Sequence, residues 1–418
     1  MKGFYKFSLL VLSAGCCCLL HLPACALAKC LMQSGKIGVD NLASNLVLGP
    51  LVYQYGPASG AAEFRYPETG DRCIYRHDGP WLHFACPGSS IDYHIGSKFL
   101  RSEASTSYLY YKDNPYGLRI HNHSFDDVHF QSDCYPVCRL APEPLMIDVS
   151  RGQRRNFSVG YYVNALDFLE VLRVRRHLGN DLSVAATVVP ALAEAPRLPH
   201  PPKFQRGAIF AETKIKFSEI YSLDYQRKIF KNVWTNDTVM DQYLNENNHL
   251  VMTQMISDDD LYYMTQQKAA YYYENTLPMW LSIARGNWRL ISRLIRELAD
   301  STDRALRVKV TPTGALRMNG SRRGEPVMMG RSLASSETLV VPQTVDKYVI
   351  DPQLPQRRGL VYRVLNDPWP SEDVIARAHE GCDLVEECQL RQPLFKDRAR
   401  GYVICCRVDM ADLEILPD

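Results

Sequence analysis

The sequence predicts a mixed α/β protein of the α+β kind, in which an antiparallel sheet is flanked by two helices and preceded by a small β-rich module. Cysteines gather toward the two ends of the 418-residue chain, and none lies between residues 146 and 380. The first part carries short strand-like runs broken by Gly and Pro, such as "GPWLHFACPG" at residues 79–88. The cysteine-free centre alternates strand-like runs with two segments of helical periodicity.

The first 28 residues have the layout of a secretory signal peptide. Lys2 and Lys6 precede an apolar core, which ends in the small-residue pattern Ala26-Leu27-Ala28. A membrane anchor is the alternative, but the core is interrupted by His21 and Pro23, whereas a spanning helix needs about 20 continuous apolar residues. We therefore expect cleavage after Ala28 and secretion to the extracellular space, and no later segment is apolar enough to predict a membrane partner.

Cysteine usage fits that compartment. Nine cysteines follow the leader, and in a secreted chain they predict disulfides with one odd thiol left over. A zinc site is the alternative, but paired CxxC units are missing. Five of the nine lie in residues 29–145, which we expect to form a disulfide-tied N-terminal module, with residues 146–418 as the second domain. Sequons at four asparagines predict a glycosylated surface: Asn122, Asn156, Asn236 and Asn319.

The first predicted helix runs from Asp258 to about Asn275. Ser257 stands before it as an N-cap, and Asp258, Asp259 and Asp260 fill its first turn, where carboxylates meet orphan amide protons and the positive end of the helix dipole. The same three aspartates could be read as a metal site. Adjacent residues of a helix do not face one another, so the capping interpretation is favoured.

The second predicted helix is "GNWRLISRLIRELAD", residues 286–300. A buried stripe recurs at spacings of three, four and three: Trp288, Ile291, Ile295 and Leu298. Another face carries a row of arginines, which we call the Arg row: Arg285, Arg289, Arg293 and Arg296. A solvated face is the plain interpretation of such a row, since Arg is a good helix former.

Charge is nevertheless distributed unevenly around this helix. The formal net charge is +2 for the whole chain and near zero without the two leader lysines, so bulk charge gives no support to nucleic-acid binding. From residue 285 to 331, however, eleven Lys and Arg stand against four Asp and Glu, a local excess of +7. Residues 236–260 hold six acids and no Lys or Arg. The net charge of the chain is thus close to zero, although its central part has one acidic and one basic segment.

The run "YYMTQQKAAYYYENTLPMWLSIARGNWRLISRLIRELA", residues 262–299, resembles the core of the DNA/RNA non-specific endonucleases, the ββα-metal nucleases. More narrowly it is similar to their secreted insect branch, which includes tsetse salivary nuclease-like proteins. Members show the pattern "RGHL.P.ADF", then "N..PQ" and "N.G.W" before a long helix. Here Asp260 falls on the family's aspartate, Asn275 and Pro278 match "N..P", and Gly286 and Trp288 match "N.G.W". The resemblance covers residues 205–412 and, more loosely, the N-terminal module, and it implies a ββα nuclease-like core.

The departures from that pattern bear on chemistry. Where the family has Arg-Gly-His, this chain has Met252-Thr253-Gln254, and glutamine cannot act as the general base, a role that typically supplies about 10² to 10⁴ in rate. Ala284 stands at the position of the metal-ligand asparagine and has no oxygen to offer Mg²⁺. Ser292 replaces the helix glutamate, and Met279 replaces the glutamine of "PQ". The resemblance thus implies a catalytically inactive homologue, a pseudoenzyme with no cofactor.

We expect such a chain to bind DNA or RNA backbone non-specifically through the Arg row, because arginine contacts to phosphate give affinity without reading sequence. Tyr262 and Tyr273 are the candidates for base stacking, although aromatics at helical spacing belong more often to a core. One alternative is a weak Mg²⁺-dependent nuclease using His249 or Asn275 as substitutes. Another is a secreted protein-interaction or structural protein, which the acidic segment favours.

Overall fold

The computed structural model describes residues 49–56, 59–66, 81–95, 98–101, 104–111, 118–122, 125–129, 134–150, 155–176, 183–190, 197–211, 216–234, 237–318, 326–330, 338–352, 358–386, 388 and 392–409. The predicted signal peptide and the sequons at Asn236 and Asn319 lie outside these residues. Within them, no helix is long and apolar enough to cross a lipid bilayer.

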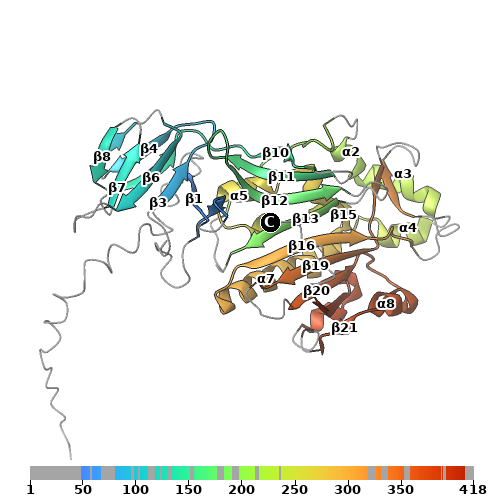
Figure 1. The fold of residues 1–418 in the computed structure, drawn as a ribbon. Coiled ribbons are helices and arrows are strands. Elements are labelled where there is room, and N and C mark those ends of the chain that lie inside the picture. Colours follow the sequence, from blue (N-terminus) through green and yellow to red (C-terminus); the bar gives the residue numbers. More distant parts are fainter. Residues whose placement is uncertain are drawn as a thin grey trace, which may run out of the picture.

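Two antiparallel sheets form the N-terminal part of the molecule (Figure 1). The first has the order β2-β1-β3-β6-β7-β8, with bounds Ala62–Phe64, Leu51–Tyr55, Trp81–Ala85, Thr106–Tyr111, Leu118–Asn122 and Phe125–His129. The second has the order β5-β4-β9, with bounds Lys98–Leu100, Ile91–Ile95 and Cys134–Cys138. A disulfide between Cys86 and Cys138 ties the end of β3 to β9.

The remainder is built on a nine-stranded antiparallel sheet, order β10-β11-β12-β13-β16-β19-β20-β22-β21. Its strands are Leu145–Asp148, Arg155–Tyr162, Phe168–Arg176, Ser183–Val189, Leu306–Thr313, Thr344–Ile350, Arg358–Leu365, Val403–Asp409 and Asp383–Leu384. Alternation sets which side chains face inward: on β16, Leu306, Val308 and Val310 are buried while their neighbours are half-exposed. The predicted class, an antiparallel sheet flanked by helices, is confirmed.

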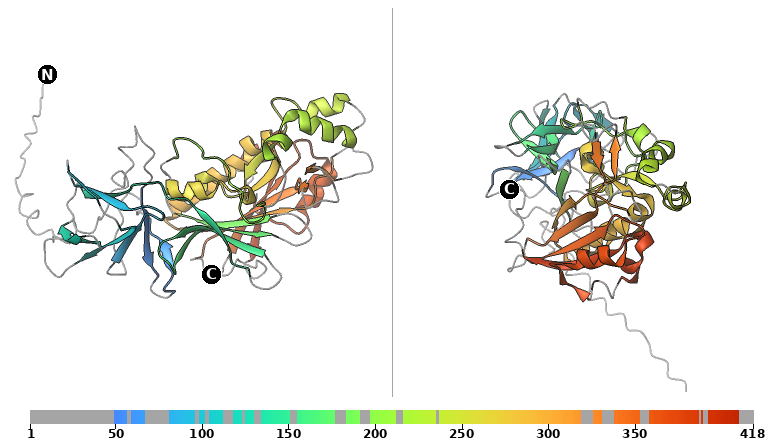
Figure 2. Two further views of the ribbon diagram at one scale, coloured as in Figure 1. Left: turned by 90° about the horizontal axis from the view of Figure 1, so that it is seen from above. Right: turned by 90° about the vertical axis from the view of Figure 1, so that its right-hand side faces the viewer.

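Helices and a short hairpin cover one face of this sheet (Figure 2, left). The early helices are α2, Phe217–Ile220, α3, Leu223–Val233, and α4, Asp237–Tyr243. The hairpin pairs β14, Leu250–Gln254, with β15, Thr276–Trp280, and a second two-stranded pair joins β17, Met328–Gly330, to β18, Thr338–Val340. One continuous core links the helices, the hairpin and the inner face of the sheet.

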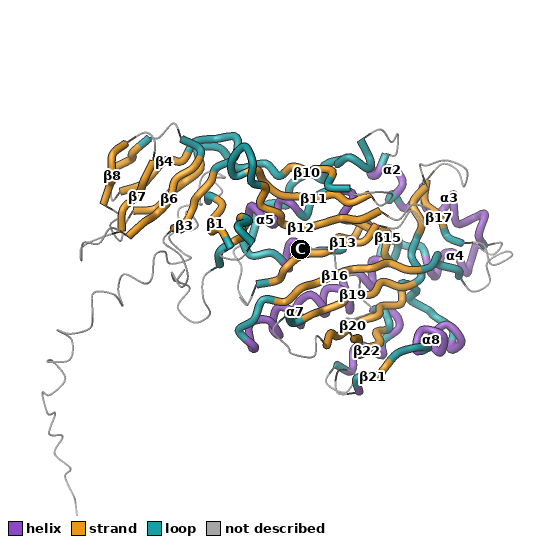
Figure 3. The backbone as a smooth tube through the Cα atoms, in the orientation of Figure 1, coloured by secondary structure: helices purple, strands orange, loops and turns teal. Residues whose placement is uncertain are grey.

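The first predicted helix is wrong in its extent. The segment breaks into a 3₁₀ turn η1, Asp258–Asp260, a short helix α5, Met264–Ala269, and a second turn η2, Tyr273–Asn275. Helix α5 is labelled in Figure 3. Tyr262 and Tyr263 leave helical geometry and pack against Tyr66, so tertiary burial of aromatic rings outweighs helix propensity. The N-cap is confirmed: the Ser257 side chain accepts from the Asp259 amide, and the Asp260 carboxylate accepts from the Ser257 amide.

The second predicted helix is confirmed, with a modified start. A short helix α6, Leu281–Ile283, passes into a π-helical turn η3, Ala284–Trp288, and then into α7, Arg289–Thr302. Trp288, Ile291 and Ile295 are buried as predicted, but Leu298 is 38% exposed and Ala299 is buried instead. The buried stripe advances by four residues at that step, because the helix has about 3.6 residues per turn.

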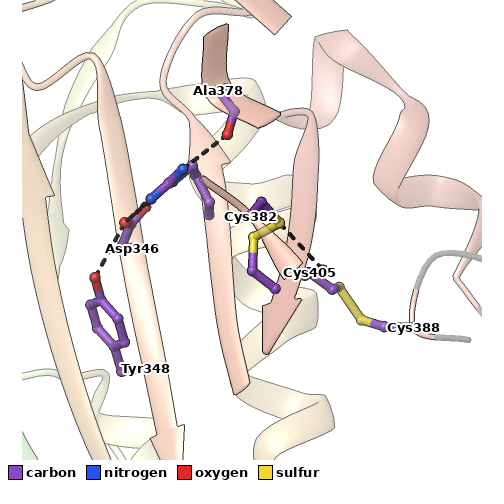
Figure 4. The surroundings of a disulfide bond; sticks show 8 residues. Asp346, Tyr348, Ala378, Cys382, Cys388 and Cys405 are labelled. Carbon is purple, nitrogen blue, oxygen red and sulfur yellow. Dashed lines mark hydrogen bonds and ion pairs between the residues drawn. A yellow bond between two sulfur atoms is a disulfide. The ribbon is translucent and has the colours of Figure 1, made fainter. Parts of the chain in front are cut away.

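Disulfides close the C-terminal edge of the large sheet. Cys405 and Cys406 are neighbours on β22, so their side chains point to opposite faces. Cys405 pairs with Cys388, and Cys406 pairs with Cys382 (Figure 4). Cys382 follows shortly after helix α8, Glu372–His379. The prediction of disulfides is confirmed. Cys30, Cys73 and the Cys134 side chain lie outside what is described, so the odd thiol stays a prediction.

Candidate functional site

A strand–strand–helix unit forms the centre of the helical face: β14 and β15 pair antiparallel, and α6, η3 and α7 follow directly. The hairpin register places Gln254 opposite Thr276 and Leu250 opposite Trp280. Gly286 allows η3 to lie against the turn η6, Arg398–Arg400, because a Cβ at Gly286 would be 2.7 Å from the Arg400 carbonyl oxygen. The adjacent Asn287 is fully buried and donates to the carbonyls of Leu394 and Gly401 at 2.8 and 2.7 Å.

A pocket of about 450 Å³ opens over this unit. It is lined by Phe204, Val251, Met252, Thr253, Gln254, Ser257, Asp259, Tyr271, Leu281, Ala284, Arg285, Trp288, Arg289 and Ser292. Three positions that depart from the nuclease pattern, Gln254, Ala284 and Ser292, therefore lie around one pocket, together with two members of the Arg row.

Gln254 is held by backbone contacts. Its Nε2 donates to the Ala270 carbonyl at 3.3 Å, and its Oε1 accepts from the Asp258 amide at 3.3 Å. The Gln254 carbonyl accepts from the Trp288 indole N–H at 3.2 Å, which ties β14 to η3. The side chain thus has a structural role at the pocket wall, and an amide has no proton-accepting chemistry at ordinary pH.

The three aspartates of η1 have separate partners. Asp258 accepts from the Tyr271 hydroxyl at 2.6 Å, and burial together with this contact raises the pKa of Tyr271. Asp259 lines the pocket and lies 3.6 Å from the Arg197 guanidinium. Asp260 is buried and forms an ion pair with Lys347 at 2.8 Å. Each carboxylate near the pocket therefore has a cation or a hydroxyl beside it, and the three do not converge on one point.

Lys347, on β19, contacts the pocket-lining residue Ser292 but does not itself line the pocket. Its Nζ donates to Asp260 Oδ2 and to Ser292 Oγ, both at 2.8 Å, and lies 5.2 Å from the centroid of the Trp288 ring. The Lys347 and Asp260 side chains are both fully buried. Burying two charges is costly unless they pair closely, and this pair does so. The second oxygen, Asp260 Oδ1, has no hydrogen-bond partner among the described residues.

The pocket does not fit the divalent-metal centre that the nuclease resemblance implies. Mg²⁺ prefers oxygen ligands, but the methyl group of Ala284 stands where the ligand asparagine is expected. Asp259 is the single carboxylate in the described lining. No group of three or more His, Cys, Asp or Glu side chains within the described residues is arranged to hold a metal ion.

The Arg row divides along α7. Arg285 and Arg289 are exposed and line the pocket rather than packing on the N-terminal module, and neither forms an ion pair with a described residue. Arg293 is exposed and lies 3.5 Å from Glu297, a surface pair of small energy. Arg296 is half-buried, and its Nε is buried without a partner among the described groups. Two of the four arginines thus line the pocket.

The remaining candidates lie elsewhere. Tyr262 is 4% exposed and packs edge-on against Tyr66, which makes it a core residue. Tyr273 is half-buried and stacks on Phe217 with ring centroids 3.8 Å apart. Asn275 is fully buried, and its Oδ1 accepts from the Ile256 amide at 3.0 Å. His249 faces the Asn245 carbonyl at 3.3 Å and is not part of the pocket wall.

Lys347 is the site residue that sequence reasoning missed. A signal was present: "TVDKYVI" at residues 344–350 places an acid and a base at neighbouring positions of an otherwise apolar strand. Side chains alternate across a sheet, so Asp346 faces away from Lys347. There Asp346 meets Arg363 at 3.1 Å, while burial raises the Asp346 pKa and the guanidinium opposes that rise (Figure 4).

No family model matches this chain. It is 26% identical over 185 residues to Salivary protein Tsal2A of Glossina morsitans morsitans, covering 43% of this chain and 44% of that protein. It is 27% identical over 147 residues to Salivary endonuclease of Lutzomyia longipalpis, covering 34% and 32%. Salivary protein Tsal1 of Glossina morsitans morsitans is 25% identical over 165 residues, covering 39% of each.

These alignments span less than half of each relative. The resemblance to insect salivary nuclease-like proteins that the motifs indicated is confirmed by them. Among solved structures, a chain in the crystal structure of the EndoG/EndoGI complex gives a TM-score of 0.27 at 12% identity, covering 50% of this chain and 81% of that one.

Proposed function

We propose that this chain is a secreted, nuclease-related protein that binds DNA or RNA non-specifically and lacks catalytic activity. The observation that carries the proposal is the pair Arg285 and Arg289 at the rim of the pocket, without ion-pair partners among the described residues. Similarity to proteins named salivary protein and salivary endonuclease supports both secretion and a nuclease-related role.

The local electrostatics support binding of a polyanion. Asp258 is hydrogen-bonded to Tyr271, Asp259 lies beside Arg197, and Asp260 pairs with Lys347. Asp259 and Asp260 are paired with cations, and Asp258 is not among the residues that line the pocket, so the guanidinium groups of Arg285 and Arg289 supply the unpaired charge of the described pocket lining. Guanidinium forks match the geometry of phosphate oxygens, and such contacts give affinity without sequence preference.

The same geometry supports the absence of catalysis. A general base is required to activate water, and at the position of the family histidine the wall offers the amide of Gln254. The one carboxylate in the described lining, Asp259, is engaged by the Arg197 guanidinium. Ala284 offers no metal ligand. A phosphodiester bound in the pocket would meet groups that hold it and none that cleave it.

A filter-binding titration tests the proposal. We expect the protein to bind single- and double-stranded DNA and RNA of unrelated sequence, with affinity that falls steeply between about 50 and about 200 mM salt. Arg285→Gln with Arg289→Gln removes two phosphate contacts, and the slope of log affinity against log salt is then about 2 units shallower on duplex DNA. Absence of salt-sensitive affinity for either nucleic acid would contradict the proposal and favour a protein-interaction or structural role.

A matched control tests whether position or net charge matters. Arg377 on α8 and Lys396 are both exposed, and they lie outside the pocket. Arg377→Gln with Lys396→Gln removes the same charge, so equal losses in the two double variants would point to bulk attraction in place of a site.

A second candidate is a weak metal-dependent nuclease, which the relative named Salivary endonuclease favours. A plasmid-nicking assay with Mg²⁺ or Mn²⁺, with and without chelator, separates the two. Chelator-sensitive nicking by purified protein that is lost in His249→Ala would support the enzyme, whereas we expect intact plasmid in every condition.

A further inference from the structure

A buried cation sits under the candidate pocket and reaches it through one hydroxyl group. Lys347 Nζ is 2.8 Å from Ser292 Oγ, and Ser292 lines the pocket although only 3% of the residue is exposed. Asp260 holds the ammonium from the other side at 2.8 Å, and the Trp288 ring lies 5.2 Å away. The lysine therefore has a fixed position, set by two hydrogen bonds and by complete burial.

This contact fixes the direction of the Ser292 hydroxyl. An ammonium group can only donate, so Ser292 Oγ accepts from Lys347 and its own hydrogen must point elsewhere. No acceptor for that hydrogen is found among the described side chains and carbonyls, and Ser292 is one of the residues that line the pocket. A hydroxyl that accepts from a cation is also polarised into a stronger donor. Ser292 is thus prepared to donate to an anion in the pocket.

The rest of the wall indicates what kind of anion fits. Arg285 and Arg289 offer two positive charges at the mouth, against the single carboxylate of Asp259, which is itself compensated by Arg197. A phosphomonoester carries about −1.5 to −2 charge near neutral pH, which these two guanidinium groups match. Phe204, Tyr271 and Trp288 supply aromatic surface in the same pocket, whose volume of about 450 Å³ lies in the range of small-ligand sites.

We propose that this pocket binds a nucleotide carrying a terminal phosphomonoester, and that Ser292, polarised by Lys347, donates to the phosphate in place of a metal ion. The inference rests on the proposed function, because it names a subsite within the same nucleic-acid surface. Ser292 is the group that touches the ligand, while Lys347 and Asp260 are positioning residues. Binding therefore needs no divalent cation.

Isothermal titration of the full-length secreted protein with adenosine 5′-monophosphate tests the inference, with adenosine as the unphosphorylated control. We expect one site per chain, the same affinity in EDTA and in Mg²⁺, and adenosine binding weaker by about tenfold or more. Ser292→Ala lowers affinity for the monophosphate by about tenfold and leaves adenosine binding unchanged. Its thermal stability falls, because the buried Lys347 ammonium loses one acceptor, so binding is measured well below the melting temperature of the variant. Ser292→Thr keeps the hydroxyl and restores phosphate binding. The loss of monophosphate affinity without loss of adenosine affinity in Ser292→Ala is the readout that a purely structural role would not give.

A second variant tests the lysine without leaving a buried charge alone. Lys347→Met combined with Asp260→Asn removes both charges at nearly constant volume, so the fold is retained while the polarisation of Ser292 is lost. We expect its monophosphate affinity to fall toward that of Ser292→Ala. Equal affinity of wild type and both variants, equal binding of monophosphate and adenosine, or binding that requires Mg²⁺ would overturn the inference.

The outcomes also separate this inference from the proposed function. If the protein binds long oligonucleotides in a salt-sensitive way but does not bind the monophosphate, the nucleotide pocket is contradicted and the proposed function stands. Loss of both kinds of binding removes both. Binding of the monophosphate without binding of oligonucleotides leaves a nucleotide-binding protein and contradicts the polymer proposal.

Discussion

At the residue scale, the Lys347–Asp260 pair governs both the stability of the site and its charge. Both side chains are fully buried, and their charged atoms are 2.8 Å apart. Removing one partner leaves the other charge buried and uncompensated, which destabilises the fold. Removing both charges at similar volume changes the free energy of unfolding much less. The pair is thus expected to behave as a unit under mutation.

We predict that Lys347→Met alone lowers the free energy of unfolding by about 3 to 5 kcal/mol, and that adding Asp260→Asn recovers most of this loss. Urea denaturation of the two variants beside wild type measures the difference. If the double variant is as unstable as the single one, the cost does not come from an unpaired carboxylate.

Asp367 gives the second prediction at this scale. Burial raises its pKa from 3.8 to about 6, opposed by the hydrogen bond that its Oδ1 accepts from the Trp369 amide at 2.9 Å. Because the folded pKa lies above the unfolded one, the folded state binds more protons between the two values. Stability from this group is therefore present below pH 3.8 and is lost as pH rises through about 6.

Asp367→Asn removes that titration. Relative to wild type, the variant should gain up to about 3 kcal/mol in free energy of unfolding at pH 7.5 and almost nothing at pH 4. Urea midpoints at the two pH values check this, and Asn keeps an oxygen that can accept from the Trp369 amide. A gain that is equal at both pH values would exclude Asp367 as its source.

At the element scale, the close contact between η3 and η6 positions the whole candidate site. Gly286 faces Arg400, and Asn287 donates to two carbonyls of the same C-terminal region. This contact sets where α7 begins, and hence where Arg285, Arg289 and Ser292 meet the hairpin. The motif glycine of the resemblance therefore has a packing role in this chain.

Gly286→Ala should cost about 1 to 3 kcal/mol of stability, because the new methyl group would lie 2.7 Å from the Arg400 carbonyl oxygen. Thermal denaturation followed by circular dichroism measures it. Glu297→Ala on the exposed side of α7 serves as the control and should change stability by less than about 1 kcal/mol. If Gly286→Ala is as stable as the control, η6 can shift away from η3 without cost, and the close contact does not stabilise the fold.

At the scale of the whole molecule, the N-terminal module is held against α5 by specific polar and aromatic contacts. Tyr263 donates to the Arg65 carbonyl at 2.5 Å, Gln266 donates to the Tyr66 hydroxyl at 2.6 Å, and the Tyr66 and Tyr263 rings stack at 5.7 Å. Burial raises the pKa of Tyr66 to about 12, although the hydrogen bond from Gln266 lowers it. These contacts place the module beside the segment that carries the capped aspartates.

Tyr66→Ala should loosen this contact without unfolding the large sheet, because it removes a stacked ring and leaves the Gln266 amide unpaired. Hydrogen exchange followed by mass spectrometry should show faster exchange in β1, β2 and α5, with β16 and β19 still protected. Uniformly faster exchange across both parts would indicate one cooperative unit and contradict separate docking.

The sequence by itself determined much of this architecture. Apolar spacing located α7, capping chemistry located the turn at Ser257, and cysteine clustering in an expected secreted chain predicted the disulfides. Local pattern suffices for these features, because each depends on residues a few positions apart. Through the resemblance, the sequence also singled out Gln254, Ala284 and Ser292, which the structure places around one pocket.

Only the tertiary structure decided what those positions do. The buried tyrosines break the first helix, and the Arg row divides into a pocket half and a surface half. Lys347 reaches the site from a strand 87 residues after Asp260 in the chain. Such effects arise from contacts between segments distant in sequence, where burial and charge compensation outweigh local propensity. A local pattern such as the acid and base of β19 does not show which distant residues they will meet.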